Sequence, residues 1–379
     1  MMKHTGFLGL LGLMLLAVFG CQSPQNSNEV VIGEFASLTG TTATFGQSSH
    51  RGLQLAIDQI NQAGGVLGKK IRLQTEDTQS RPEDAASAVT KLISRDHVVT
   101  VIGEVASSRS LAGAPICQEN RIPMVSPAST NPQVTQKGDY IFRICYTDPF
   151  QGEMLAKFAY RSLGLRQVAI LKDVKNDYSI GLSQFFTKTF TELGGHIIAE
   201  QAYSEGDTDF KAQLTSLKQK NPQAIFLPGY YSEAALVIKQ ARELNMMMPF
   251  LGGDGMDSPK LAEIAGADAL QNCYYSNHYT NQDTSAVVQN FIKDYNKAYH
   301  EIPDAMAALA YDAGYIVADA IRRAKSTDPS LIRAALATTK DFMGVTGKVT
   351  IDANRNAAKS IVILELVKGL PKYLETIKP

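Results

Sequence analysis

Short apolar segments alternate with amphipathic helical patterns along most of the chain, and few folds accommodate such a pattern. The segment VVIGEFA (30–36) is followed by a helical pattern near 46–62, in which Leu53, Ile57 and Ile60 lie on one stripe. Strands that alternate with helices in this way form parallel sheets whose two faces are covered by the helices. The alternation therefore predicts an α/β fold.

The same alternation restarts after about residue 148, so the chain contains two series of predicted strands. A chain of 379 residues is also longer than a single hydrophobic core usually supports. We therefore predict two doubly wound parallel-sheet lobes, joined by several crossings that form a hinge. The predicted strands are 30–36, 69–77, 98–104 and 122–127 in the first series, and 167–173, 196–204, 224–230 and 249–254 in the second.

The last third of the chain returns to helices and then to strands, and we expect it to complete both lobes. Helical patterns cover 284–299, 304–325 and 328–339, and the final predicted strands are KVTID (348–352) and KSIVILELVKG (359–369). The predicted first lobe comprises 30–147 and 278–350, and the predicted second lobe comprises 148–277 and 351–379.

The composition excludes several classes of function. Lys and Arg together number 37, as do Asp and Glu, so neither net charge nor a basic run indicates a nucleic-acid partner. The histidines at 50, 97, 196, 278 and 300 lack the spacing of metal ligands, and we predict no metal and no cofactor. The sequence holds no dinucleotide-binding glycine loop in a strand–turn–helix context, no Walker loop, no His-Glu-x-x-His and no Gly-x-Ser-x-Gly motif, which argues against an enzyme.

The N-terminus has the pattern of an export signal. A basic start precedes an apolar run from Phe7 to Phe19, which is too short to span a membrane comfortably. The run ends in Val-Phe-Gly-Cys, which resembles the lipobox of bacterial lipoproteins, where the cysteine becomes the acylated N-terminus. The resemblance implies a signal peptide over 1–20, lipidation of Cys21 and a polar tether over 21–29. A plain signal peptide with an incidental cysteine, or a short anchor, is the alternative.

Three cysteines remain beyond Cys21, at positions 117, 145 and 273. Export would permit one disulfide, and Cys117–Cys145 is the candidate pair. Three buried thiols are an equally favoured alternative.

In open parallel sheets, ligands bind beyond the carboxyl ends of the strands, so the residues that follow each predicted strand are candidates for a binding site. One such segment is SPASTNP (126–132), in which small hydroxyl residues are held between prolines. That composition is either ordinary turn chemistry or a rigid set of hydrogen-bond donors that faces a ligand. The other segments of this kind are 37–46, 105–110, 174–181, 229–233 and 252–257.

Ser107 and Ser108 lie where the next helix is predicted to begin. A serine there is either an N-cap or part of an anion site, because free N–H groups at a helix N-terminus also hold a carboxylate. Thr130 offers a second hydroxyl at the adjacent strand end, so the two positions match both oxygens of one carboxylate. The second series offers Tyr178, Tyr230 and Asp254. An acid opposite a carboxylate site is what a zwitterion requires.

Eight segments carry a family resemblance when they are read together: GEFASLTGTTATFG, AIDQINQAGGVLGKKIRL, VIGEVASSRS, IPMVSPASTNP, YIFRI, KNDYSIG, PGYYSE and FLGGDGMDS. They resemble the branched-chain amino acid (Leu/Ile/Val) binding proteins of ABC importers, in the type I periplasmic-binding-protein family. The resemblance covers about 30–370. It implies two hinged lobes that close on a free amino acid and deliver it to an ABC permease.

The resemblance also implies roles for single residues at the amino acid's head group. Ser107 and Thr130 match positions whose hydroxyl and N–H groups bind the α-carboxylate. Ala128 matches a backbone carbonyl that accepts a hydrogen bond from the α-ammonium group, and Asp254 matches the acid that pairs with it. The segment SPASTNP is then a donor shelf that its prolines hold stiff, so that little order must be gained on binding.

Aromatic residues complete the implied site. Tyr178 and Tyr230 match second-lobe residues that close over the ligand, and Phe45 matches an aromatic residue that packs on its side chain. The full predicted ligand-binding set is Phe45, Val105, Ala106, Ser107, Ala128, Ser129, Thr130, Tyr178, Tyr230 and Asp254.

The sequence says less about which side chain the ligand carries than about how its head group is bound. Phe45, Val105, Ala106 and Met306 make the predicted pocket mostly apolar, which favours an aliphatic amino acid. Glu104 lies two residues before Ala106, near the predicted end of the ligand side chain. A buried acid beside an aliphatic ligand is costly, so Glu104 either points away or selects a polar or cationic side chain.

Three functions are compatible with these patterns. The favoured one is a lipid-anchored, monomeric substrate-binding protein that closes on a free amino acid and serves an ABC permease. The second is a sensor of the same fold, which reports an amide, a polar amino acid or another small metabolite to a signalling partner. The third is an enzyme on a two-lobed α/β frame, which the missing catalytic motifs disfavour.

Overall fold

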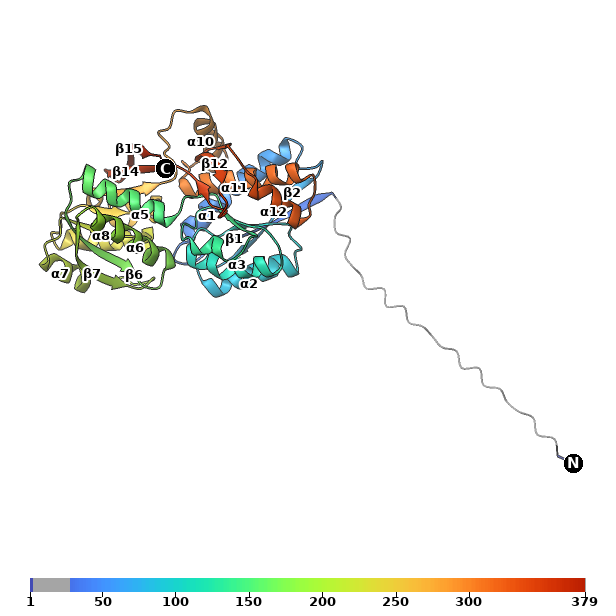
Figure 1. Ribbon diagram of the computed structural model, residues 1–379, viewed down its shortest axis with the longest axis horizontal. Coiled ribbons are helices and arrows are strands. Elements are labelled where there is room, and N and C mark those ends of the chain that lie inside the picture. The colour runs from blue at the N-terminus through green and yellow to red at the C-terminus, as the bar shows by residue number, and fades with distance from the viewer. Residues whose placement is uncertain (3–27, 379) are drawn as a thin grey trace.

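The computed structural model describes residues 1–2 and 28–378, and two sheets organise them into two lobes that lie side by side (Figure 1). The predicted signal peptide beyond Met2 and the predicted lipidation site Cys21 lie outside these residues. No helix in the described part of the chain is both long enough and apolar enough to cross a membrane.

The first lobe is built on five parallel strands in the order β2-β1-β3-β4-β5. Successive side chains of a strand point to opposite faces, and β1 follows this rule: Ile32 packs into the core on one face and Phe35 into the core on the other. The strands are β1 (Glu29–Ala36), β2 (Lys70–Asp77), β3 (Val101–Gly103), β4 (Met124–Ser126) and β5 (Ile141–Arg143).

The second lobe is built on seven strands in the order β15-β14-β10-β9-β8-β6-β7. The strands from β6 to β10 are parallel, as the alternation predicts, but β14 and β15 are antiparallel to their neighbours. Lys368 and Gly369 both have positive φ and join β14 to β15, as in the tight two-residue turns that favour hairpins. The strands are β6 (Gln167–Asp173), β7 (His196–Tyr203), β8 (Ala224–Phe226), β9 (Phe250–Gly252), β10 (Cys273–Asn277), β14 (Ile361–Val367) and β15 (Leu370–Ile377).

Helices cover both faces of each sheet. In the first lobe α1 packs on α11, and α2 packs on α3; in the second lobe α5 packs on α6 (Figure 1). The longer helices are α1 (Ala43–Gln62), α2 (Pro82–Ser94), α3 (Ser107–Glu119), α5 (Asp148–Lys157), α6 (Asp177–Glu192), α7 (Lys211–Gln219), α8 (Tyr231–Glu243), α10 (Ala286–Tyr299), α11 (Ala305–Ala324) and α12 (Pro329–Ala337). The shorter ones are α4 (Gln133–Gln136), η1 (Phe158–Ser162), η2 (Asp254–Met256), α9 (Pro259–Ala265) and η3 (Ala267–Leu270).

The chain passes between the lobes three times, after β5, after β10 and before β14. These crossings form the predicted hinge. A small sheet of β11 (Phe342–Gly344), β12 (Gly347–Ile351) and β13 (Ala357–Ala358) precedes the last crossing, and Arg143 N donates to Arg355 O at 3.1 Å beside it. The residue bounds of the two lobes stay predictions.

The predicted disulfide between Cys117 and Cys145 is wrong, because both residues have free thiols in the described structure. Cys117 packs in the core beneath α2 and α3, whereas Cys145 lies in the other core of the lobe and donates to Ser129 O at 3.3 Å. Burial raises the pKa of Cys145 to about 12. The alternative of buried, unreactive thiols is confirmed for both, and Cys273 is free and buried as well.

Candidate functional site

The carboxyl ends of the strands in the two sheets bring their loops face to face across the hinge, and a small cavity lies between these loops. Its lining combines residues from both lobes: Phe45, Val105, Ser107, Ala128, Thr130, Tyr178, Tyr230, Asp254, Gly255 and Met306. All but Gly255 were expected at the site. The structure therefore brings together residues that are up to 261 positions apart in the chain, from Phe45 to Met306.

The first-lobe side of the cavity presents hydrogen-bond donors. Ser107 is the first residue of α3, and Ala106 precedes it as the N-cap without a side-chain capping bond. The N–H groups in the first turn of a helix have no partner inside the helix, so they can bind an anion. The hydroxyl of Thr130, buried in the described structure, also has no hydrogen-bond partner there. The interpretation of Ser107 as an N-cap is therefore wrong. The arrangement of the donors at Ser107 and Thr130 remains compatible with an anion site.

Residues behind the cavity hold this donor shelf in place. Ser129 Oγ lies 2.7 Å from Ser110 Oγ and donates to Val105 O at 3.0 Å, so Ser129 and the buried Ala106 support the shelf without lining the cavity. Arg143 donates to the carbonyl oxygens of Ser129 and Asn131, the latter at 2.6 Å. Burial lowers the pKa of this guanidinium, which is fully enclosed in the core. Sequence reasoning missed Arg143, although an arginine within a buried strand was a signal.

Glu104 does not reach the cavity. Its carboxylate accepts hydrogen bonds from Ser37 Oγ, from Thr78 Oγ1 at 3.0 Å and from Ala106 N at 2.6 Å. Ser37 and Thr78 follow β1 and β2, and Glu104 does not line the cavity, so the side chain points away from the predicted pocket. The predicted specificity contact of Glu104 is therefore not made in this structure.

The second-lobe side of the cavity presents an acid. Asp254 accepts from Gln151 Nε2 at 2.7 Å and approaches His278 Nε2 at 2.9 Å. His278 is fully buried and stacks on Tyr146 with ring centroids 3.8 Å apart. Burial lowers the pKa of His278, so the ring is neutral near pH 7 and donates to Asp254 through Nε2. No cationic side chain neutralises the Asp254 carboxylate within residues 28–378.

Gln151 and His278 were not predicted as part of the site. Gln151 lies on α5 and His278 just after β10, so each reaches Asp254 from a different crossing between the lobes. His278 was expected to be a surface or packing residue, and no short-range pattern marks either residue as a partner of Asp254.

Aromatic rings from both lobes meet over the cavity. Tyr178 stacks on Tyr230 with centroids 5.3 Å apart, and Phe45 from the first lobe contacts Tyr230 edge-on at 5.6 Å. Gly255 N donates to Tyr178 Oη at 3.2 Å, and a side chain at Gly255 would approach Gly229 O to 2.6 Å. The missed residue Gly255 is thus a glycine because the backbone comes close to the tyrosine wall.

Hydrogen bonds across the cleft hold the lobes together. Asp177 N donates to Ser108 Oγ at 3.0 Å, and Asn131 Nδ2 donates to Asp177 O at 2.9 Å. Glu205 accepts from Arg109 at 3.1 Å and from Thr41 at 2.6 Å. The cavity that remains measures about 10 Å³, about the volume that a single water occupies. A larger ligand therefore enters only when the lobes separate, which fits a hinged clamp.

The site has no sign of metal chemistry. In the described ranges, His, Cys, Asp and Glu side chains form no group of three or more that could hold a metal ion. The polar groups of the cavity suit reversible binding of a small ligand that carries both an anionic and a cationic group.

Comparison with known proteins identifies the family. The family described as periplasmic binding protein matches residues 29–369. Leu/Ile/Val-binding protein homolog 2 of Brucella abortus is 31% identical over 97% of this chain and 97% of its own length. Leu/Ile/Val-binding protein BraC3 of Rhizobium johnstonii is 30% identical over 86% of this chain and 89% of its own.

Solved structures agree with this result. The leucine binding protein LivK of Thermotoga maritima is 41% identical, with a TM-score of 0.89 over 92% of this chain and 99% of that one. The substrate binding protein LivJ of Streptococcus pneumoniae, solved in complex with isoleucine, is 34% identical, with a TM-score of 0.88 over 93% and 100%. On the strength of the family match and of these relatives, the chain belongs to the periplasmic binding protein family.

Proposed function

We propose that this chain is an extracytoplasmic substrate-binding lipoprotein of an ABC importer, and that it binds a free branched-chain amino acid between its lobes. One observation carries the proposal: a single cavity joins Asp254, which lacks a cationic partner within residues 28–378, to the donors of Ser107 and Thr130. An α-amino acid presents the complementary pair of charges. The names of the relatives LivK and LivJ support the same ligand class.

The carboxylate and the ammonium group of the amino acid bind to different sets of residues. Its carboxylate accepts hydrogen bonds from the hydroxyls of Ser107 and Thr130 and from the free N–H groups at the start of α3. Its ammonium group donates to Asp254 and to the carbonyl oxygen of Ala128. The carboxylate half lies on the first lobe and Asp254 on the second, so the ligand favours the closed arrangement of the lobes by binding it better.

The side chain of the ligand meets apolar groups. Phe45, Val105 and Met306 line the cavity, and Glu104 is turned toward Ser37 and Thr78 instead. An aliphatic side chain therefore leaves no buried charge without a partner, whereas a cationic side chain finds no acid at that end. This arrangement supports leucine, isoleucine or valine over polar amino acids.

The remaining parts of the proposal concern location and partners. A lipid on Cys21 tethers a monomer to the outer face of a bacterial membrane, and the closed form docks on an ABC permease. The protein does no bond chemistry in this account. His278 donates to Asp254, and its Nδ1 has no partner in the described structure.

A thermal-unfolding screen of the purified protein against the twenty amino acids tests the ligand class. A ligand at a hundredfold excess over its Kd stabilises the folded state by about 2.7 kcal/mol. Stabilisation confined to leucine, isoleucine and valine is the expected result. Stabilisation by polar or cationic amino acids alone would overturn the aliphatic assignment, and no response to any amino acid would overturn the ligand class.

A further inference from the structure

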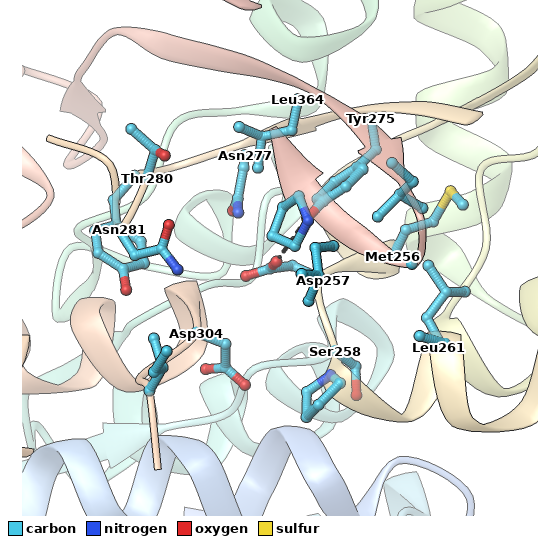
Figure 2. Close-up of a pocket in the computed structure, with 18 of the residues that line it drawn as sticks. Met256, Asp257, Ser258, Leu261, Tyr275, Asn277, Thr280, Asn281, Asp304 and Leu364 are labelled. Carbon is cyan, nitrogen blue, oxygen red and sulfur yellow. Dashed lines mark hydrogen bonds between the residues drawn. The ribbon is translucent and has the colours of Figure 1, made fainter. Parts of the chain in front are cut away.

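A second cavity lies behind the ligand cleft, where the second sheet meets the segments that cross between the lobes. It measures about 270 Å³, far larger than the space left in the cleft. Figure 2 shows Asp257 and Asp304 with their carboxylates directed into it, below Tyr275 and Asn277. None of the residues that line this cavity lines the cleft.

Residues that are neighbours in the chain line the two cavities. Asp254 and Gly255 line the cleft, and the next residues in the chain, Met256 and Asp257, line the second cavity. Likewise, at the start of α11, Asp304 lines the second cavity and Met306 lines the cleft.

Two acids lie in the second cavity without a counter-charge. Asp257 accepts from Tyr275 Oη at 3.0 Å and from Ala305 N at 2.8 Å, and Asp304 accepts from Ser48 Oγ at 2.5 Å. No lysine or arginine of residues 28–378 pairs with either carboxylate. Burial and the neighbouring Asp257 raise the pKa of Asp304 to about 7, and burial also raises the pKa of Asp257.

Helix capping explains only part of this arrangement. Asp304 is the N-cap of α11 and accepts from Ala307 N at 3.0 Å, and Asp257 accepts from the first N–H of the same helix. One acid suffices to cap a helix, and surface water usually solvates a second. Here the second acid is 7% exposed and faces a cavity.

Most of the other residues that line the second cavity are apolar, together with a few polar side chains. Leu261, Leu364 and Leu366 form its walls, and Ile302 and Leu370 stand at its mouth. The last two side chains are 64% and 70% exposed, which is unusual for large aliphatic residues at one opening. The cavity therefore combines an acidic floor with largely apolar walls and an apolar mouth.

We propose that this second cavity binds a small organic ammonium ion with an apolar body, its charged end between Asp257 and Asp304 and its body against Leu261 and Leu364. The cation supplies the counter-charge that the two carboxylates lack. A metal ion is a poorer match, because no group of three or more His, Cys, Asp or Glu side chains in residues 28–378 could hold one.

Calorimetric titration of the purified full chain with n-hexylammonium chloride tests the site. We expect saturable binding, with hexanol and hexanoate at least tenfold weaker, because only the ammonium ion matches the acids. Equal binding of hexanol would overturn the proposal, since the carboxylates would then contribute nothing. Absence of saturable hexylammonium binding would overturn it as well.

Variants locate the bound amine. Asp304→Asn keeps an N-cap residue but removes the charge, and we expect it to weaken hexylammonium binding at least tenfold. Asp328→Asn, which makes the same change at the N-cap of α12, is the matched control and leaves the affinity within twofold. A loss confined to Asp254→Asn would place the amine in the cleft and overturn the proposal.

A second pair of variants avoids the helix cap. Leu370→Lys places a positive charge at the mouth from an exposed position, so the fold tolerates it, and hexylammonium binding falls at least fivefold. Leu331→Lys, at an exposed leucine on α12, is the control and leaves the hexylammonium affinity unchanged. Equal affinities in these two variants would contradict the location.

Discussion

His278 Nε2 lies 2.9 Å from Asp254 Oδ2, and the neutral imidazole orients the carboxylate without cancelling its charge. Burial against Tyr146 lowers the pKa of His278, so this pair is a hydrogen bond between a neutral donor and an anion. Gln151 donates to the other oxygen at 2.7 Å. Asp254 is thus fixed in position by two neutral donors, and its carboxylate keeps the acceptor atoms that binding an ammonium group requires.

Asp254→Asn removes that charge while keeping the size of the side chain. We expect leucine affinity to fall at least about thirtyfold, because removing one partner of a buried charge pair costs about 2–5 kcal/mol. Calorimetric titration measures the change, and Asp268→Asn, at an exposed acid of the same lobe, is the control. An affinity within threefold of wild type would contradict the assignment of Asp254 to the ammonium group.

Glu205→Gln weakens the contact between the lobes without touching the cavity. Glu205 accepts from Arg109 and Thr41 across the cleft, so its loss destabilises the closed form. We expect leucine to dissociate about three- to tenfold faster, on the order of 1 kcal/mol, with little change in association. Stopped-flow kinetics measures both rates. Glu200→Gln, on β7 shortly before Glu205 and paired with Lys172, is the control and should leave both rates unchanged.

Glu104→Gln tests whether this acid selects ligands or supports the loop. The carboxylate accepts three hydrogen bonds away from the cavity, so we expect the free energy of unfolding to fall by about 1–3 kcal/mol. The order of affinities among leucine, isoleucine, valine and arginine should not change. If the variant instead exchanges its preference between aliphatic and cationic amino acids, Glu104 is a specificity residue after all.

Asp148 gives the fold a dependence on pH. Both of its oxygens are buried without a partner in the described structure, and burial raises its pKa from 3.8 to about 8. Between these two pH values the folded chain holds a proton on Asp148 that the unfolded chain releases. The contribution of this proton to the free energy of unfolding is therefore complete below pH 3.8 and is lost as the pH rises through about 8.

Asp148→Asn should remove this loss of unfolding free energy at high pH. We expect the variant to exceed wild type in unfolding free energy by about 2–5 kcal/mol at pH 8.5 and by much less at pH 4.5. Urea unfolding at both values measures the difference. Glu83→Gln, at an exposed acid in the first turn of α2, serves as the control. A difference that is equal at the two pH values would show that Asp148 is ionised in the fold.

Cys21→Ser tests the anchor. If lipidation holds the protein on the membrane, this variant moves from the membrane fraction to the soluble fraction while its leucine affinity stays the same. Fractionation followed by immunoblotting measures the distribution. Retention of the variant on membranes would contradict lipidation at Cys21.

The sequence predicted which residues lie together at one cavity, because their placement follows a rule of parallel sheets. Ser107, Thr130 and Asp254 each lie at or just after the carboxyl end of a predicted strand, where the loops of parallel strands meet at one edge. Their roles in binding came from the family resemblance and stay predictions. Backbone geometry near Gly255 could not be foreseen, because it depends on how closely a tyrosine from another helix approaches.

Other features depend on contacts that no local pattern encodes. Gln151 and His278 meet Asp254 only because two separate crossings converge on the loop after β9, and the direction of Glu104 depends on donors that follow other strands. Strand β15 was missed because half of its residues are polar or exposed, so it lacks the apolar run of a core strand. The spacing of the cysteines in the sequence also could not decide whether Cys117 forms a disulfide.

The central claim is that the cleft binds both charged groups of a free amino acid, and blocked amino acids test it most directly. Titration with leucine, leucinamide and N-acetylleucine compares the intact head group with forms that lack the carboxylate or the ammonium charge. The account predicts tight binding of leucine and at least hundredfold weaker binding of each blocked form. Binding of leucinamide or N-acetylleucine within threefold of leucine would contradict it.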